Sequence, residues 1–143
     1  MHKNSGYTLI EVLTVIAIIV IVAGIVLPNV VAWLPKYRLN SGAEEIQSTL
    51  QLARLGAIKQ NTSATVTFST TTHTFLASID GQTIRKGKMP AGIIIDSVTS
   101  PASQVEFDSR GLANDSTGDI LVKNSKGATK TISVNIVGNA SIQ

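Results

Sequence analysis

A nearly unbroken apolar run close to the N-terminus constrains this chain more than any other feature. Residues 12–27 carry no charge and a single hydroxyl, that of Thr14. As an α-helix, residues 7–27 would measure about 31 Å, close to the roughly 30 Å hydrocarbon layer of a bilayer. We therefore predict one N-terminal helix that can cross a membrane.

The flanks of the run leave its orientation and processing open. Lys3 precedes the run and Lys36 and Arg38 follow it, so the cations do not indicate which end faces the cytoplasm. An ordinary secretory signal has a shorter apolar core and a small-residue cleavage site after it. Residues 27–29, Leu-Pro-Asn, make a poor site of that kind. Cleavage after the run and an uncleaved anchor are both alternatives here.

Glu11 is the residue that neither alternative explains. A carboxylate in hydrocarbon costs a few kcal/mol, so an acid in such a segment is a functional hypothesis that requires a partner. The simpler interpretation places Glu11 at the membrane interface near the start of the helix, where a negative charge is mildly favourable. For one isolated chain, this second interpretation is sufficient.

Two prolines follow the apolar run. Pro28 and Pro35 each lack a backbone donor and disfavour helical geometry in the preceding residue. We predict that the helix breaks, kinks or loosens near both. Ordinary termination of a membrane span explains Pro28 equally well.

Residues 39–60 form an amphipathic pattern that continues the helix. The apolar positions recur at alternating spacings of four and three, as on one face of a helix. They are Leu39, Ala43, Ile46, Leu50, Ala53 and Ala57. Leu52, Leu55 and Ile58 lie off this stripe, which indicates either a wide core-facing side, the preferred interpretation, or contact with a neighbouring subunit. A helix over residues 7–60 would be about 80 Å long.

After Asn61 the pattern changes to short β-rich runs separated by turn residues. Asp80-Gly81 is a two-residue hairpin signal, and residues 124–127 form a second turn. We predict an antiparallel sheet over the helix, with loops at 108–118 and around Pro90 and Pro101. The predicted strands are residues 64–68, 74–79, 82–86, 92–95, 104–107, 119–123 and 129–137.

Composition excludes several functions. The chain has no cysteine, which rules out a disulfide frame, a thiolate metal site and a cysteine nucleophile. The net charge is +3 and the cations are scattered, so they form no nucleic-acid-binding stripe.

The sequence also lacks the motifs of metal sites and catalytic sites. His2 and His73 cannot make a metal cluster. Residues 115–119 lack the spacing of a calcium loop, so a turn is predicted there. Neither a phosphate loop nor a nucleophile elbow is present. We predict no enzyme activity, no cofactor and no metal.

The hexapeptide Gly6-Tyr7-Thr8-Leu9-Ile10-Glu11, followed by an apolar helix, resembles the leader of type IV prepilins and type II secretion pseudopilins. The resemblance implies that a prepilin peptidase cuts after Gly6 and methylates the new amine of Tyr7. It also gives Glu11 a partner, the terminal amine of a neighbouring subunit. Because a pair formed one step out of place would leave both charges unmatched, Glu11 would set the register of the filament.

Further segments resemble the GspH/FimT group of minor pilins and pseudopilins. They include the helical residues 50–58, the loop at 107–111 and the closing strand at 132–138. Some pilus members of that group bind DNA through arginines around the final glycine. Gly138 is followed by five residues without a cation, so we do not expect DNA binding there.

Together these observations predict a pilin-like α+β fold, in which a long N-terminal helix packs on a C-terminal antiparallel β domain. The expected parts are a leader (1–6), a transmembrane and assembly helix (7–28), its amphipathic continuation (29–60) and a β-rich head (61–143). The expected function is a structural subunit, favoured as minor, of a pilus or pseudopilus. The alternatives are a major pilin and a membrane-anchored periplasmic binding module that never polymerises. The expected location is the bacterial inner membrane with a periplasmic head, and then the filament; the partners are prepilin peptidase, other subunits and the assembly platform.

Overall fold

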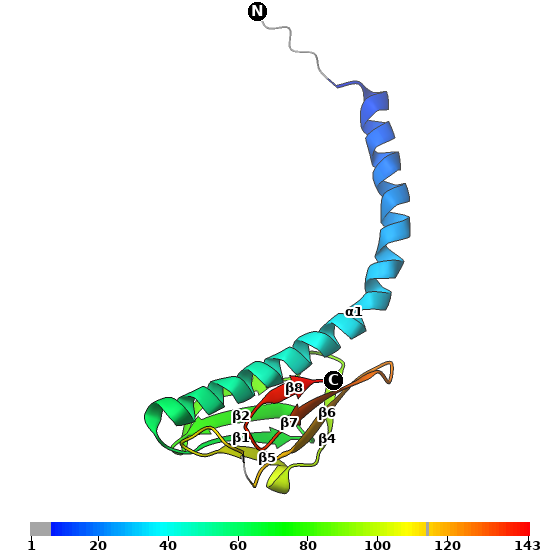
Figure 1. The fold of residues 1–143 in the computed structure, drawn as a ribbon. Coiled ribbons are helices and arrows are strands. Elements are labelled where there is room, and N and C mark those ends of the chain that lie inside the picture. Colours follow the sequence, from blue (N-terminus) through cyan, green and yellow to red (C-terminus); the bar gives the residue numbers. More distant parts are fainter. Residues whose placement is uncertain (1–6, 114) are drawn as a thin grey trace, which may run out of the picture. The chain divides into compact units, whose positions relative to one another are not determined.

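The computed structural model describes residues 7–113 and 115–143, apart from the side chains of residues 25–31. One helix, α1 (Leu9–Gln60), precedes all the strands, so the fold is α+β as predicted. The chain divides into two compact units, Met1–Leu34 and Pro35–Gln143. The second unit holds the C-terminal part of α1 and every strand (Figure 1).

The first unit is the N-terminal part of α1. Its large aliphatic side chains from Leu9 to Val22 are exposed on all sides of the helix. Among the residues that the structure describes, no helix is both long enough and apolar enough to cross a membrane. The helix assignment continues through Pro28 and Pro35, so neither proline ends α1, and the kink at these positions stays a prediction.

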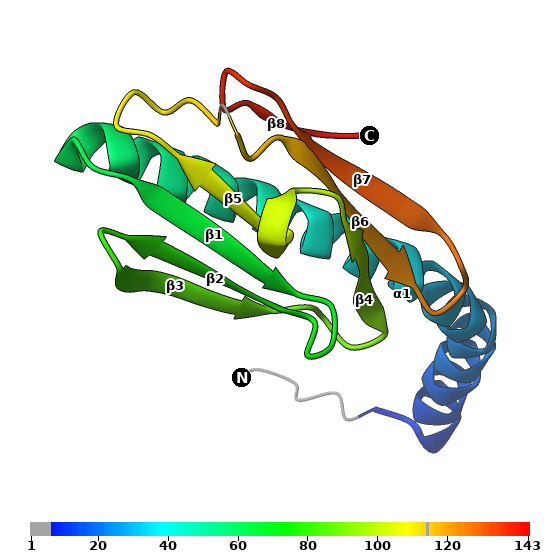
Figure 2. The same cartoon turned by 90° about the horizontal axis from the view of Figure 1, so that it is seen from below.

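Within the described residues, eight strands form two four-stranded antiparallel sheets rather than the single sheet that we predicted. The strand orders are β3-β2-β1-β5 and β4-β6-β7-β8 (Figure 2). The division arises at Pro90, where the Ile93 amide closes a turn on the Pro90 carbonyl and β4 then pairs with β6 instead of β3. The strands are β1 (Ala64–Ser69), β2 (Thr74–Ile79), β3 (Gln82–Lys88), β4 (Ile93–Val98), β5 (Gln104–Phe107), β6 (Gly118–Asn124), β7 (Thr129–Val134) and β8 (Ala140–Ile142).

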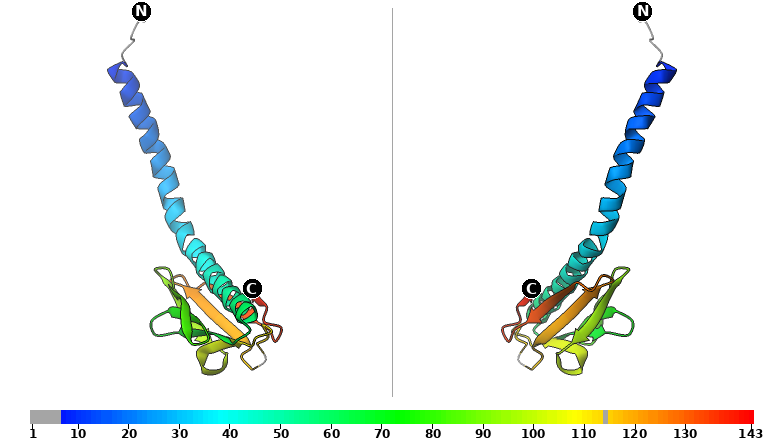
Figure 3. Two further views of the ribbon diagram at one scale, coloured as in Figure 1. Left: turned by 90° about the vertical axis from the view of Figure 1, so that its left-hand side faces the viewer. Right: turned by 90° about the vertical axis from the view of Figure 1, so that its right-hand side faces the viewer.

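Both sheets lie on one side of the C-terminal part of α1 (Figures 1 and 3). The six apolar helix residues of the predicted stripe are buried there. They form one hydrophobic core together with residues of both sheets. The preferred interpretation of Leu52, Leu55 and Ile58 was wrong, because all three are exposed. Sheets on one side of a helix cover only one face of it, so these side chains remain on the uncovered face.

Most predicted strands are confirmed with small shifts at their ends. Asp80 and Gly81 both have positive φ, as a tight hairpin turn between β2 and β3 requires. The predicted strand at 129–137 ends early, at Val134, and β8 was missed. Asn135 starts a turn in which its carbonyl accepts a hydrogen bond from the Gly138 amide. Gly138 has a left-handed backbone conformation, with φ 76°. A reversal with glycine at this position ends one strand and starts the next.

Candidate functional site

The start of α1 is capped by Thr8. The Thr8 hydroxyl accepts a hydrogen bond from the Glu11 backbone amide at 3.3 Å, and the Thr8 carbonyl accepts from the same amide at 3.1 Å. A threonine followed three residues later by glutamate is the sequence signature of a helix N-cap. Thr8 was not singled out from the sequence, although this spacing was visible there. The cap places Glu11 in the first helical turn.

Two of the predicted site residues lie together at this end. Tyr7 and Glu11 line a shallow, mostly apolar hollow of about 290 Å³ with Val12, Val15 and Ile16. Both are exposed, and Glu11 forms no ion pair among the residues that the structure describes. Gly6, the predicted cleavage residue, lies outside the described residues. The Glu11 carboxylate therefore lies beside aliphatic side chains, and the hollow has room for a chemical group from another molecule.

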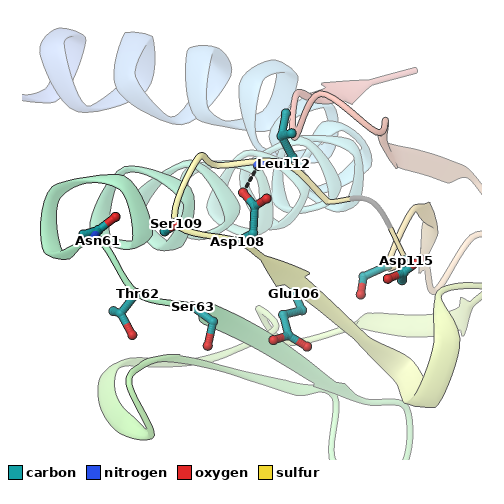
Figure 4. A pocket seen from close by; sticks show the side chains of 9 residues that line it. Asn61, Thr62, Ser63, Glu106, Asp108, Ser109, Leu112 and Asp115 are labelled. Carbon is teal, nitrogen blue, oxygen red and sulfur yellow. Dashed lines mark hydrogen bonds between the residues drawn. The ribbon is translucent and has the colours of Figure 1, made fainter.

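The second hollow lies in the globular unit and is polar. It measures about 400 Å³ and is surrounded mainly by hydroxyls and carboxylates (Figure 4). The lining residues are Asn61, Thr62, Ser63, Glu106, Asp108, Ser109, Leu112, Asp115 and Ser116. No group of three acidic, histidine or cysteine side chains that could hold a metal occurs within the described residues.

Asp108 has a local structural role at the edge of this hollow. Its carboxylate accepts hydrogen bonds from the backbone amides of Arg110 at 2.8 Å and Leu112 at 2.9 Å. It also forms an ion pair with the Arg110 guanidinium at 2.9 Å. Figure 4 shows it turned toward the Leu112 amide. The hydrogen bond from that amide is the main cause that holds the pKa of the Asp108 carboxyl below its ordinary value, and the bonds from Arg110 act in the same direction.

We predict that the 108–112 loop loosens in acid. Since the pKa of Asp108 is lower in the folded than in the unfolded state, its contribution to stability is complete above the ordinary Asp pKa of about 3.9. The contribution is lost as the pH falls through the folded-state pKa. An NMR titration of the carboxyl carbon should have its midpoint below that of the urea-unfolded chain. A midpoint equal to or above the unfolded value would contradict the assignment, and Asp108→Asn should remove the pH dependence of amide protection at Leu112.

A junction that sequence reasoning missed joins α1 to two loops. Arg54 Nε donates to the Gly111 carbonyl at 3.0 Å. Gly138 packs against that carbonyl so closely that a Cβ on it would overlap the oxygen. Ile58 lies against Gly111 from the helix side. The glycines and the arginine were visible in the sequence, but nothing there showed that three distant segments meet.

The comparisons with known proteins agree with this architecture. The profile of the family described as "Type II transport protein GspH" matches residues 42–138. The chain belongs to this family. The profile described as "Prokaryotic N-terminal methylation motif" matches residues 1–27, which include the predicted leader and the apolar run. No curated protein matches the chain.

Solved structures show the same fold at low sequence identity. The type IV minor pilin FimU of Pseudomonas aeruginosa is 17% identical, with a TM-score of 0.63 over 76% of this chain and 90% of that one. The minor pseudopilin EpsH from the Type 2 Secretion System of Vibrio cholerae is 13% identical, with a TM-score of 0.60 over 74% of this chain and 96% of that one.

Family and fold together define the class. The GspH-family chain is a structural subunit of a type IV pilus or a type II secretion pseudopilus. Its methylation motif implies processing by a prepilin peptidase and assembly with other subunits.

Proposed function

We propose that this chain is a minor subunit that is cleaved after Gly6, methylated on Tyr7 and drawn from the inner membrane into a filament through its N-terminal helix. The solved structures that share its fold are a minor pilin and a minor pseudopilin, which supports the minor role. Its work is structural rather than enzymatic. The assembly platform of the inner membrane is its partner, and DNA is not.

The observation that carries this proposal is the environment of Glu11. The carboxylate stands on a helix whose other side chains from Val12 to Val22 are almost all aliphatic, and it has no ion-pair partner among the described residues. Packing that surface against other helices would bury the charge, and an unpaired buried charge costs several kcal/mol. A methylated amine at Tyr7 of a neighbouring subunit supplies the opposite charge, and its position then sets the register.

Processing and incorporation test the proposal directly. Co-expression with a prepilin peptidase should remove six residues and add one methyl group to Tyr7, as read by intact mass. Gly6→Ala should abolish this mass change, because a side chain at the residue before the cut obstructs the peptidase. An uncut chain in the presence of an active peptidase would refute the filament role and favour an anchored periplasmic binding module.

Glu11 requires a separate control, because it also lies in the capped first turn. Glu11→Gln keeps the size and hydrogen-bonding ability of the side chain but removes its charge. We expect cleavage of this variant to be normal and its incorporation to fall at least about tenfold, the ratio that corresponds to 1.4 kcal/mol. Thr8→Ala weakens the cap by about 1 kcal/mol without changing the charge. Equal losses in both variants would assign Glu11 to capping rather than register.

A further inference from the structure

Cations that are far apart in the sequence come together at one end of the globular unit. Three segments meet there: residues 35–43 in α1, residues 88–94 between β3 and β4, and residues 122–128 around the β6–β7 turn. These segments contain five cations and no acidic side chain, whereas the whole chain has a net charge of only +3. We call the five cations the basic rim; they are Lys36, Arg38, Lys88, Lys123 and Lys126.

Hydrogen bonds join the three segments. The Arg38 guanidinium donates to the Ala91 carbonyl at 3.1 Å, and the Asn124 side chain donates to the Pro35 carbonyl at 3.4 Å. The bond to Ala91 does not cancel the charge of Arg38, because a carbonyl is neutral. The cations therefore share the end of the unit at which α1 enters it, and this proximity was not visible in the sequence.

The rim forms a positively charged surface. Its exposed members are Lys36, Lys88 and Lys126, and the other two cations are half-buried. The next acidic residues along the chain, Glu44 on α1 and Asp96 on β4, lie outside the three segments. The last residue, Gln143, also lies outside them and pairs with Thr131 on β7. A surface with an excess of one sign of charge attracts ligands of the opposite sign, here anions.

The connectivity of the chain brings a membrane surface close to the rim. The apolar run ends at Leu27, and Lys36 follows nine positions later in α1, about 14 Å along the helix whatever the arrangement of the two units. The headgroup layer outside the hydrocarbon is about 5 to 7 Å thick on each side. With the run in the hydrocarbon, Lys36 then lies within about one Debye length, roughly 8 Å, of the lipid phosphates.

Two exposed aromatic residues favour a membrane over other anionic partners. Trp33 is 57% exposed, and Tyr37, four residues later in α1 and next to Lys36, is 53% exposed. Trp and Tyr are enriched at membrane–water interfaces, where one end of the side chain is apolar and the other is wet. A nucleic-acid duplex also supplies phosphates, but it has no apolar layer that would receive the two rings.

We infer that the basic rim docks the globular unit on the anionic phospholipid headgroups of the membrane that holds the chain's own apolar run. This inference rests on the proposed function, in which the subunit starts in the inner membrane. It gives a role to Lys36 and Arg38, which the general preference for cations on the cytoplasmic side does not explain. Docking holds the head at the membrane surface until the subunit leaves for the filament.

The full-length chain in lipid vesicles tests the inference. The natural sequence has no cysteine, so Ser125→Cys places a single fluorophore on the exposed turn beside the rim. Gln60→Cys, at the exposed end of α1, is the matched label about 36 Å along the helix from Lys36. A lipid with a quencher on its headgroup reports which label lies at the surface. We expect quenching at residue 125 but not at residue 60 in vesicles that contain phosphatidylglycerol. It should disappear in pure phosphatidylcholine and in 1 M salt, where the Debye length is about 3 Å.

Charge variants connect the docking to the rim. Lys36→Gln should lower the docking equilibrium constant about fivefold, the effect of one cation near an anionic surface, and Lys36→Gln with Lys88→Gln should lower it at least about tenfold. Lys59→Gln is the matched control, because it removes the same charge from an exposed lysine at the other end of the same helix. It should leave docking unchanged. All three lysines are exposed, so the variants should unfold at the wild-type temperature.

Several results would overturn the inference. Equal quenching at residue 125 in neutral and anionic vesicles would show that the tether alone holds the head near the surface. Equal losses in Lys36→Gln and Lys59→Gln would assign the attraction to net charge rather than to the rim. Retention on duplex DNA that Lys36→Gln abolishes, without any effect of lipid charge, would assign the rim to nucleic acid. A cleaved and incorporated chain without lipid-dependent quenching refutes docking and leaves the filament role intact, whereas failed cleavage and incorporation refute the filament role whatever the vesicles show.

Discussion

Gly138→Ala should destabilise the globular unit by about 3 kcal/mol, through left-handed strain and overpacking together. Gly138 has φ 76°, a conformation that an L side chain rarely adopts. The added methyl would also overlap the Gly111 carbonyl oxygen, a backbone atom that the Arg54 hydrogen bond holds in place. Thermal unfolding followed by the β-sheet circular dichroism signal should shift down by roughly 10 °C.

Gly127→Ala is the matched control for this prediction. Gly127 also has positive φ, at 84°, but a Cβ there would meet nothing within 4 Å. Its substitution should therefore cost only the conformational strain, about 1 kcal/mol. Equal losses in the two variants would show that the close packing against Gly111 contributes nothing, and that the junction is not a rigid part of the head.

Gly87→Ala should destabilise the globular unit by about 2 kcal/mol, the middle of the range for overpacking a core. Gly87 on edge strand β3 pairs with Phe75 on β2, and the Phe75 ring lies over the space that a Cβ would fill. This ring is buried at 1% exposure, so it has little freedom to move away. An aromatic ring that covers a glycine on an edge strand is a recurrent way to stabilise a sheet.

A double-mutant cycle distinguishes this cause from a general effect of alanine in a strand. In a Phe75→Leu background the ring is absent, so Gly87→Ala should cost less than about 1 kcal/mol. Denaturant unfolding of the four variants measures the coupling. If Gly87→Ala costs the same in both backgrounds, the loss does not come from the Phe75 ring.

How well each part of the fold could be predicted depends on how far apart in the sequence its interacting residues are. The stripe from Leu39 to Ala57 was predicted residue by residue, because burial of one helix face leaves a periodic signal in the sequence. The Asp80-Gly81 turn was equally clear, since few residue pairs accept positive φ at both positions. The exposure of Leu52, Leu55 and Ile58 was predicted wrongly. The sequence shows that a side chain is apolar, but it does not show whether the chain's own core or a partner covers that side chain.

The candidate site likewise has local features that the sequence shows and non-local features that it does not show. The motif at residues 6–11 and the acid at Glu11 are local, so the sequence alone indicated the class to which the chain belongs, and the Thr8 cap could have been inferred from its spacing to Glu11. The junction of Arg54, Gly111 and Gly138 could not, because these residues are far apart in the sequence and their proximity depends on how the loops pack.

The sequence by itself determined the long N-terminal helix, the position of nearly every strand and the family of the chain, because hydrophobic periodicity, turn chemistry and a short processing motif are all properties of neighbouring residues. Only the tertiary structure decided that the strands form two sheets, that α1 is covered on one side, and that Arg54, Gly111 and Gly138 hold the β7–β8 turn. Those features depend on contacts between distant segments, whose pairing is selected by the packing of the whole core.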